Sequence, residues 1–149
     1  MIIGINAPHP MGRVQMPDPS PPLRSLVTGG AGALGAAIIH ALRSRGDRVV
    51  CLDRVRPARL DIEFVELDVS CRASVRDAME TAVDLLGGVD VLVNAAGIMR
   101  TSRFCDLDEA TFREVLDVNL LGAFHVAQEA VRHMMRSGGR VLLITSIHG

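Results

Sequence analysis

The sequence predicts an α/β fold with a doubly wound parallel sheet, and two observations carry this prediction. From Leu23 onward, short apolar runs alternate with stretches whose apolar residues recur at helical spacing. Strands that alternate with helices are joined by right-handed crossovers, so they run parallel in one sheet. In addition, a cluster of glycines separates the first apolar run from the first helical stretch, which is the arrangement of a nucleotide-binding strand–turn–helix.

The expected elements follow one another in a regular order. We predict strands at 25–28, 48–52, 62–67, 89–93 and 140–145, and helices at 34–45, 71–86 and 108–136. Ser70 is the expected N-cap of the second helix. Glycines follow each helical stretch and mark its end.

Residues 1–22 differ from the rest of the chain. They contain six of the seven prolines and no periodic apolar pattern. We expect a disordered or loosely attached extension over 1–22, with an arm that packs on a partner as the alternative. Residues 23–149 are then expected to form a partial dinucleotide-binding domain.

Composition excludes several classes of protein. A chain of 149 residues suits one domain, and no apolar run approaches the length of a bilayer span. The net charge of −1 gives no reason to expect a nucleic acid or a membrane as partner. Three widely spaced cysteines, and histidines without metal-ligand spacing, indicate neither a disulfide framework nor a metal site. We therefore expect a cytoplasmic protein without a bound metal.

The glycine turn is the first candidate site. Gly30, Gly32 and Gly35 satisfy G-x-G-x-x-G, in which the backbone turns tightly and approaches a pyrophosphate closely. The first N–H groups of the following helix then face the anion. By itself the pattern is weak, since a glycine-rich turn after a strand can be only a turn.

Asp53 ends the second predicted strand, where dinucleotide-binding folds place an acid on the adenosine ribose. A carboxylate there accepts both ribose hydroxyls and repels a 2′-phosphate, so we favour NAD over NADP. Arg54 is able to bind a 2′-phosphate and weakens that preference. A solvated loop aspartate is the alternative reading of Asp53.

The fourth predicted strand ends in Asn94-Ala95-Ala96-Gly97, where small residues let a ligand lie against the backbone and the amide can tie strand ends together. With Thr28-Gly29, Asp68-Val69 and Val118-Asn119, this segment resembles the signatures of the short-chain dehydrogenase/reductase family, in its order and spacing. The resemblance covers 23–149. It implies a Rossmann-like sheet of strand order 3-2-1-4-5 and NAD(P)-dependent interconversion of a small-molecule alcohol and a carbonyl.

The resemblance also assigns roles to residues. The expected cofactor-binding residues are Thr28, Gly29, Gly30, Gly32, Leu34 and Gly35 at the pyrophosphate, Asp53 at the ribose, Asp68 and Val69 at the adenine, and Asn94, Ala95, Ala96 and Gly97 beneath the cofactor. The expected catalytic residues are Ser146, which would orient the substrate oxygen, and Asn119, which would hold a water in a proton relay. A core amide bonded to backbone is the alternative for Asn119, because it lies within a predicted inward stripe of Phe112, Val115, Leu116, Ala123, Val126 and Ala130.

The sequence departs from the family pattern at two places. Ala33 stands where the commonest branch of the family has glycine, and the glycines instead match the T-G-x-x-G-x-x-G of the extended branch. The family's Tyr-x-x-x-Lys pair, together with its C-terminal strands and helices, would fall beyond Gly149, and the chain contains no Tyr and no Lys. Hydride transfer to a carbonyl leaves an alkoxide that must gain a proton, and that pair would supply it.

These departures leave alternatives open. The chain by itself is either part of an NAD-dependent oxidoreductase or a non-catalytic dinucleotide-binding or interaction module; a methyltransferase on a similar sheet is disfavoured by Thr28-Gly29 and the Asn94 motif. The 108–136 helix carries a second apolar stripe of Leu121, Phe124, Val131 and Met135. We expect this stripe to support a homo-oligomer, the fifth strand to be an uncovered edge, and the isolated chain to be marginally stable or aggregation-prone.

Overall fold

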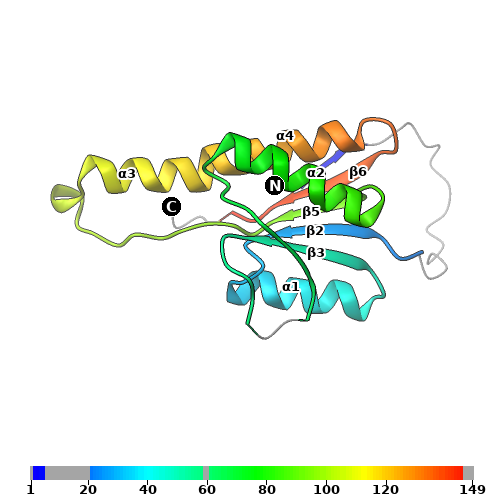
Figure 1. Cartoon of the computed structure of the whole chain (residues 1–149). Helices are drawn as coiled ribbons and strands as arrows, with labels where there is room; N and C mark the ends of the chain where they lie inside the picture. Colours follow the sequence, from blue (N-terminus) through cyan, green and yellow to red (C-terminus); the bar gives the residue numbers. More distant parts are fainter. Residues whose placement is uncertain (1, 6–20, 59–60, 146–149) are drawn as a thin grey trace, which may run out of the picture.

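The computed structural model describes residues 2–5, 21–58 and 61–145. A twisted sheet lies between helices on its two faces, as Figure 1 shows. The strands are β1 (Ile2–Ile5), β2 (Arg24–Thr28), β3 (Arg48–Asp53), β4 (Glu63–Glu66), β5 (Val91–Asn94) and β6 (Gly139–Leu143). The helices are α1 (Ala33–Ser44), α2 (Arg72–Leu86), the short η1 (Phe104–Asp106), α3 (Glu109–Leu116), the π-helical η2 (Asp117–Gly122) and α4 (Ala123–Met134).

The sheet confirms the predicted fold class and strand order. Its order is β1-β6-β5-β2-β3-β4, and β2 to β6 pair in parallel. Read from β4 to β6, the five predicted strands therefore stand in the order 3-2-1-4-5. The central strand β2 pairs Val27 with Cys51 on one side and with Val93 on the other.

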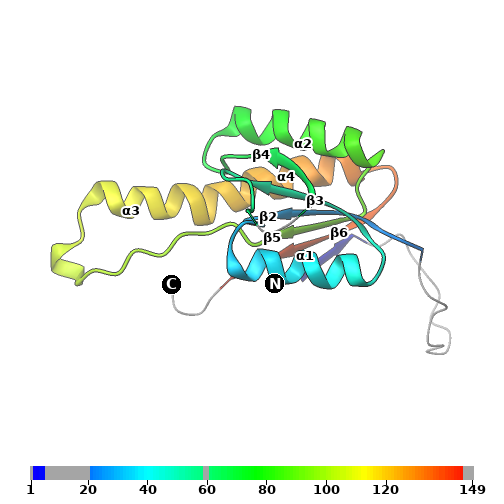
Figure 2. The ribbon, with the colours of Figure 1, turned by 60° about the horizontal axis from the view of Figure 1, so that its bottom comes forward.

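The two faces of the sheet bury separate sets of apolar side chains, because successive strand residues point in opposite directions. Leu26, Leu52 and Leu92 pack toward α2 and α4. Val27 and Val93 belong to the cluster on the other face, where α1 lies. Figure 2 shows α1 on one side of the sheet and α2 with α4 on the other. Burial on both faces explains why these strands read as continuous apolar runs.

An additional strand lies at the edge that the sequence predicts to be uncovered. β1 pairs antiparallel with β6, with Ile2 opposite Leu142 and Ile5 opposite Gly139. The expectation of an uncovered fifth strand is therefore wrong for this structure. The sequence pattern misses β1 because four residues are too few to establish a period, and the pairing joins the two ends of the chain. Residues 6–20 of the expected extension lie outside the described residues.

The predicted 108–136 helix is one long rod with a π-helical segment, η2, between α3 and α4. The predicted inward stripe is correct only in α4, where Val126 and Ala130 are fully buried. In α3 the prediction is wrong, because Phe112 is 51% exposed and Leu116 is 37% exposed. The reason is tertiary: α3 projects past the end of the sheet, so the sheet does not cover its apolar face (Figure 1).

Candidate functional site

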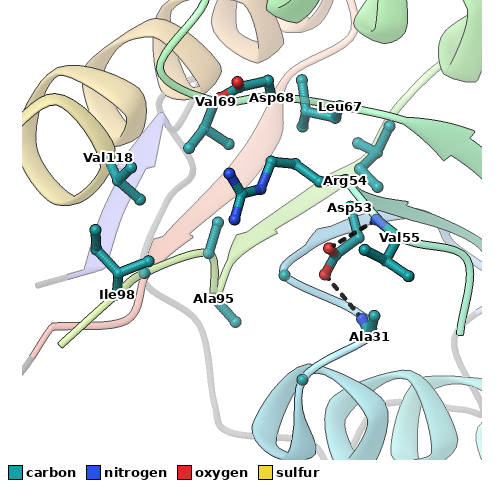
Figure 3. A pocket seen from close by; sticks show the side chains of 15 residues that line it. Ala31, Asp53, Arg54, Val55, Leu67, Asp68, Val69, Ala95, Ile98 and Val118 are labelled. Carbon is teal, nitrogen blue, oxygen red and sulfur yellow. Dashed lines mark hydrogen bonds between the residues drawn. The ribbon is translucent and has the colours of Figure 1, made fainter. Parts of the chain in front are cut away.

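The candidate site is a pocket of about 440 Å³ at the carboxyl ends of β2, β3 and β5. The chain passes from β2 to β3 on one side and later reaches β5 on the other, so the pocket lies where the strand order reverses. Such switch points are where open α/β sheets bind ligands. Figure 3 shows the pocket, whose lining residues are Gly29, Ala31, Gly32, Leu52, Asp53, Arg54, Val55, Leu67, Asp68, Val69, Ala95, Ala96, Gly97, Ile98 and Val118.

The glycine turn is packed too closely to accept side chains. Gly29 has φ +68°, and a Cβ at this position would lie 2.6 Å from the carbonyl carbon and oxygen of Ala95. A Cβ at Gly35 would overlap the carbonyl oxygen of Gly29, which also accepts the N–H of Gly32 at 3.1 Å. The turn, the start of α1 and the segment after β5 are thereby held against one another.

The N-terminus of α1 opens toward this turn. Its N-cap is Gly32, and among the described residues no side chain caps the first turn. Uncapped N–H groups at a helix start carry partial positive charge and bind phosphate groups. Ala33, the departure from the commonest family pattern, is the first residue of α1 and is exposed, so its methyl group displaces no neighbour.

The Asp53 carboxylate faces the turn from the end of β3. Its two oxygens accept the N–H groups of Ala31 at 3.0 Å and of Val55 at 3.2 Å, the bonds drawn in Figure 3. The neighbouring Arg54 extends its guanidinium across the pocket, between Val69 and Ala95 (Figure 3). The pocket is therefore lined by a carboxylate and a guanidinium of opposite charge, from the neighbouring residues Asp53 and Arg54.

Asp68 and Val69 form the opposite wall. The Asp68 carboxylate accepts the N–H of Ser70 at 3.0 Å and its hydroxyl at 2.6 Å. The Asp68 N–H donates to the Ser74 hydroxyl at 3.0 Å. The prediction that Ser70 caps α2 is wrong, since Cys71 is the N-cap residue and Ser70 is engaged with Asp68 instead.

Thr28 and Asn94 hold the ends of β2 and β5 together beneath the pocket. The Thr28 hydroxyl donates to Asn94 Oδ1 at 2.5 Å and accepts the N–H of Ala96 at 3.3 Å. Both side chains are buried, with Thr28 at 0% and Asn94 at 3% exposure. These two side chains therefore shape the backbone of Ala95 and Ala96 and do not line the pocket.

Asn119 lies in η2 and contacts the loop after β5. Its Oδ1 accepts the N–H of Ile98 at 2.8 Å, and its Nδ2 donates to the carbonyl of the same residue at 2.8 Å. The alternative reading of Asn119 as a core amide is wrong in its burial, because Asn119 is exposed, and right in its hydrogen bonding to backbone. Both ends of its side chain are nevertheless occupied by backbone, so this amide clamps the Ile98 loop. Ser146, the other expected catalytic residue, lies outside the described residues.

The predicted cofactor residues divide into two groups. Those that line the pocket are Gly29, Gly32, Asp53, Asp68, Val69, Ala95, Ala96 and Gly97. Thr28, Gly30, Gly35 and Asn94 lie behind the surface; a Cβ at Gly30, for example, would lie 2.5 Å from the Cys51 sulfur. Leu34 belongs to neither group: it is 54% exposed and is not among the lining residues. The lining residues absent from the predicted cofactor set are Ala31, Leu52, Arg54, Val55, Leu67, Ile98 and Val118. All but Val118 lie within two residues of a predicted cofactor residue, and Val118 precedes Asn119.

The buried Cys51 thiol is not among the groups that line this pocket. Burial, aided by the nearby Asp53 charge, raises the pKa of the Cys51 thiol to about 11, so it stays protonated near neutrality. Within the described ranges, no three His, Cys, Asp or Glu side chains gather as a metal site would require. None of the helices in these ranges is long and apolar enough to cross a membrane.

Comparisons with known proteins agree with this geometry. Residues 24–149 match the model of the short chain dehydrogenase family. The chain is 36% identical over 137 residues to a granaticin polyketide synthase putative ketoacyl reductase of Streptomyces violaceoruber, covering 84% of this chain and 55% of the relative. It is 34% identical over 138 residues to the 3-oxoacyl-(acyl-carrier-protein) reductase FabG of Aquifex aeolicus, covering 84% and 56%. The chain thus spans little more than half the length of these relatives.

Solved structures of short chain dehydrogenases and related dehydrogenases also resemble this chain in fold. A short chain dehydrogenase from Leptospira borgpetersenii with bound NAD+ superposes with a TM-score of 0.80 at 28% identity, covering 94% of this chain and 59% of that one. Ligand-free aldohexose dehydrogenase from Thermoplasma acidophilum gives a TM-score of 0.79 at 26% identity, covering 84% and 50%.

Proposed function

Because the chain belongs to the short-chain dehydrogenase/reductase family, we propose that its pocket binds NAD and that the chain forms the cofactor-binding part of an oxidoreductase that interconverts an alcohol and a carbonyl. The observation that carries this proposal is the pocket at the switch point, bordered by the glycine turn, the open N-terminus of α1 and Asp53. When bound, the dinucleotide supplies the hydride that is exchanged with the substrate.

The residues of the pocket fit such a group. The absence of side chains at Gly29 and Gly32 leaves room at the α1 N-terminus, where the helix dipole favours a pyrophosphate. Asp53 would accept ribose hydroxyls, as its carboxylate already accepts two N–H groups at the pocket edge. Asp68 and Val69 would contact the adenine, and Ala95 to Gly97 would lie beneath the cofactor.

The choice between NAD and NADP depends on two neighbouring charges. Asp53 repels a 2′-phosphate, whereas the Arg54 guanidinium in the pocket would attract one. We expect Asp53 to decide the preference for NAD, because its carboxylate is held in place by the Ala31 N–H. Calorimetric titration with NADH and NADPH tests this: NADH should bind more tightly, Asp53→Asn should reduce the difference, and Arg54→Ala should leave NADH affinity unchanged. Tighter binding of NADPH that disappears in Arg54→Ala would contradict the preference for NAD.

For the chemical step we assign Ser146 to the substrate oxygen and Asn119 to positioning. Asn119 holds the Ile98 loop at the pocket rim through two hydrogen bonds, which supports a role in shaping the site where substrate meets cofactor. The sequence contains no Tyr and no Lys to return a proton to the alkoxide. The second candidate function is a dinucleotide-binding or interaction module without catalytic activity, since the chain spans little more than half the length of the curated relatives.

Hydride transfer separates the two candidates. The chain is mixed with NADH and a panel of ketones and β-keto thioesters, and oxidation of NADH is followed at 340 nm. Turnover that is lost in Ser146→Ala supports the oxidoreductase, whereas saturable NADH binding without turnover supports the module. Failure of both NADH and NADPH to bind would contradict the oxidoreductase and the dinucleotide-binding module, and only an interaction module would remain.

We also propose a cytoplasmic homo-oligomer. Its cysteines are free thiols, which suits a reducing compartment. Of the apolar stripe expected from the sequence, Leu121, Phe124 and Met135 are 46%, 53% and 78% exposed along η2, α4 and the residue after α4, whereas Val131 packs against the core. Burying this stripe against a second copy would remove it from water. Sedimentation velocity should show a dimer or larger species, and Phe124→Glu should shift it toward the monomer.

A further inference from the structure

We propose that α4 positions the Asp68-Val69 wall of the pocket, and that Gly122 and His125 are the positioning residues. Neither residue is among those that line the pocket. Both contact Val69, which does line it. This role rests on the proposed dinucleotide site, because the wall lies at the end of the pocket where Asp53 would hold the adenosine ribose.

Gly122 provides the first contact, at the point where η2 meets α4. Gly122 is buried, and a Cβ at this position would lie 2.8 Å from Val69 Cγ2 and 3.0 Å from Val69 Cβ. Val69 is 7% exposed and lines the pocket with its remaining surface. Figure 3 shows the Val69 side chain in the pocket wall, beside the helix that carries Val118. A side chain at position 122 must therefore displace the Val69 side chain, the helix, or both.

His125 provides the second contact. It lies three residues beyond Gly122 on the same face of the helix and is half-buried. Its Nδ1 is 3.4 Å from the Val69 carbonyl oxygen, a long contact in which an Nδ1–H donates. One helix face thus holds both the side chain and the backbone of Val69.

The wall has a second support in α2, and that support is itself tied to α4. Ser74 of α2 accepts the Asp68 N–H at 3.0 Å. Arg72, in the first turn of α2, donates to Gln128 and lies 3.4 Å from the carboxylate of Glu129, which is buried in α4. The wall is therefore fixed between two helices, and α4 contacts it directly and through α2.

The experiment compares Gly122→Ala and His125→Leu with three controls. His125→Asn keeps a donor near the Nδ1 position, and His133→Leu changes an exposed histidine of the same helix. Val69→Ala removes Cγ2, the atom nearest to a Cβ at position 122. Hydrogen exchange of residues 67–71 is measured in the ligand-free chain, and affinity is measured by calorimetry with adenosine 5′-monophosphate and with NADH.

In Gly122→Ala and His125→Leu we expect faster exchange at 67–71 and affinity for adenosine 5′-monophosphate about tenfold weaker, as for loss of one well-placed contact. His125→Asn and His133→Leu should resemble the wild type, and Val69→Ala should remove most of the exchange effect of Gly122→Ala. Unchanged hydrogen exchange at 67–71 in both test variants would overturn the role of α4, whether or not the ligand affinity changes. Faster exchange with unchanged affinity would overturn the positioning role. Absence of NADH binding by the wild-type chain would instead overturn the proposed function, while the exchange comparison would still decide whether α4 holds the wall.

Discussion

Replacing Gly29 by alanine tests whether the glycine turn is constrained by its surroundings or only by its own backbone. Gly29 has φ +68° and sits against the backbone of Ala95 and Ala96, with a hypothetical Cβ 2.6 Å from their carbonyl and amide atoms. Gly46 is the matched control, since it has φ +94° and its Cβ would meet nothing within 4 Å. Both variants carry the cost of a left-handed residue, and only Gly29→Ala adds a clash.

The free-energy cost of the left-handed backbone and the cost of the clash can be estimated separately from the structure. A left-handed conformation costs a non-glycine residue about 1–2 kcal/mol. Overpacking against atoms that cannot rotate away costs a further ~1–3 kcal/mol. We therefore expect Gly46→Ala to lower the free energy of unfolding by about 1–2 kcal/mol and Gly29→Ala by roughly 2–5 kcal/mol.

Urea denaturation of the ligand-free chain measures both losses, and calorimetry with NADH measures binding. Gly29→Ala should also weaken NADH binding, because the backbone that must yield belongs to the pocket-lining residues Ala95 and Ala96. Gly46→Ala should bind NADH like the wild type. If the two variants lose the same stability to within about 0.5 kcal/mol, the close approach of Gly29 to Ala95 does not constrain the turn, and our account of the glycine motif is refuted.

Three further experiments test the hydrogen bonds and burial of residues in the central strands and their connections. Thr28→Val leaves the buried amide of Asn94 without its hydroxyl partner and should lower the free energy of unfolding by about 1–3 kcal/mol in urea, whereas a loss below ~0.5 kcal/mol would contradict this. Hydrogen bonding to the Arg24 guanidinium holds the pKa of Asp90 below its usual range, so the ionised carboxylate stabilises the fold near neutrality and this contribution is lost as the pH falls through that lowered pKa. The stability difference between wild type and Asp90→Asn should therefore shrink below about pH 4, and a difference that grows there would show the opposite linkage. Burial raises the pKa of Cys51 to about 11, so a thiol reagent at neutral pH should label the two exposed cysteines rapidly and Cys51 only on unfolding; rapid labelling of all three would disagree.

The long helix shows where prediction from sequence stops. Its 3.6-residue period correctly predicts that Val126 and Ala130 face the core. The same period runs on through Phe112, which is exposed, because periodicity identifies an apolar face and cannot say whether the sheet extends far enough to cover it. Likewise, Asn119 could be recognised as an unusual polar residue within that face, but its partner Ile98 is brought to it only by the path of the loop after β5.

The sequence by itself determined the parallel sheet, its strand order and most of the polar and small residues at the strand ends. The parallel sheet and the glycine turn follow from local signals, namely apolar runs that must be buried on both faces and glycines required where the backbone turns. The strand order and the roles of the strand-end residues follow from the resemblance to the short-chain dehydrogenase/reductase family. Tertiary structure alone decided the antiparallel pairing of Ile2–Ile5 with β6 and the separation of pocket-lining glycines from glycines that serve packing. It also decided the contact of α4 with Val69. Each of these depends on contacts between residues far apart in the chain, and their geometry exists only once the sheet has placed its strands side by side.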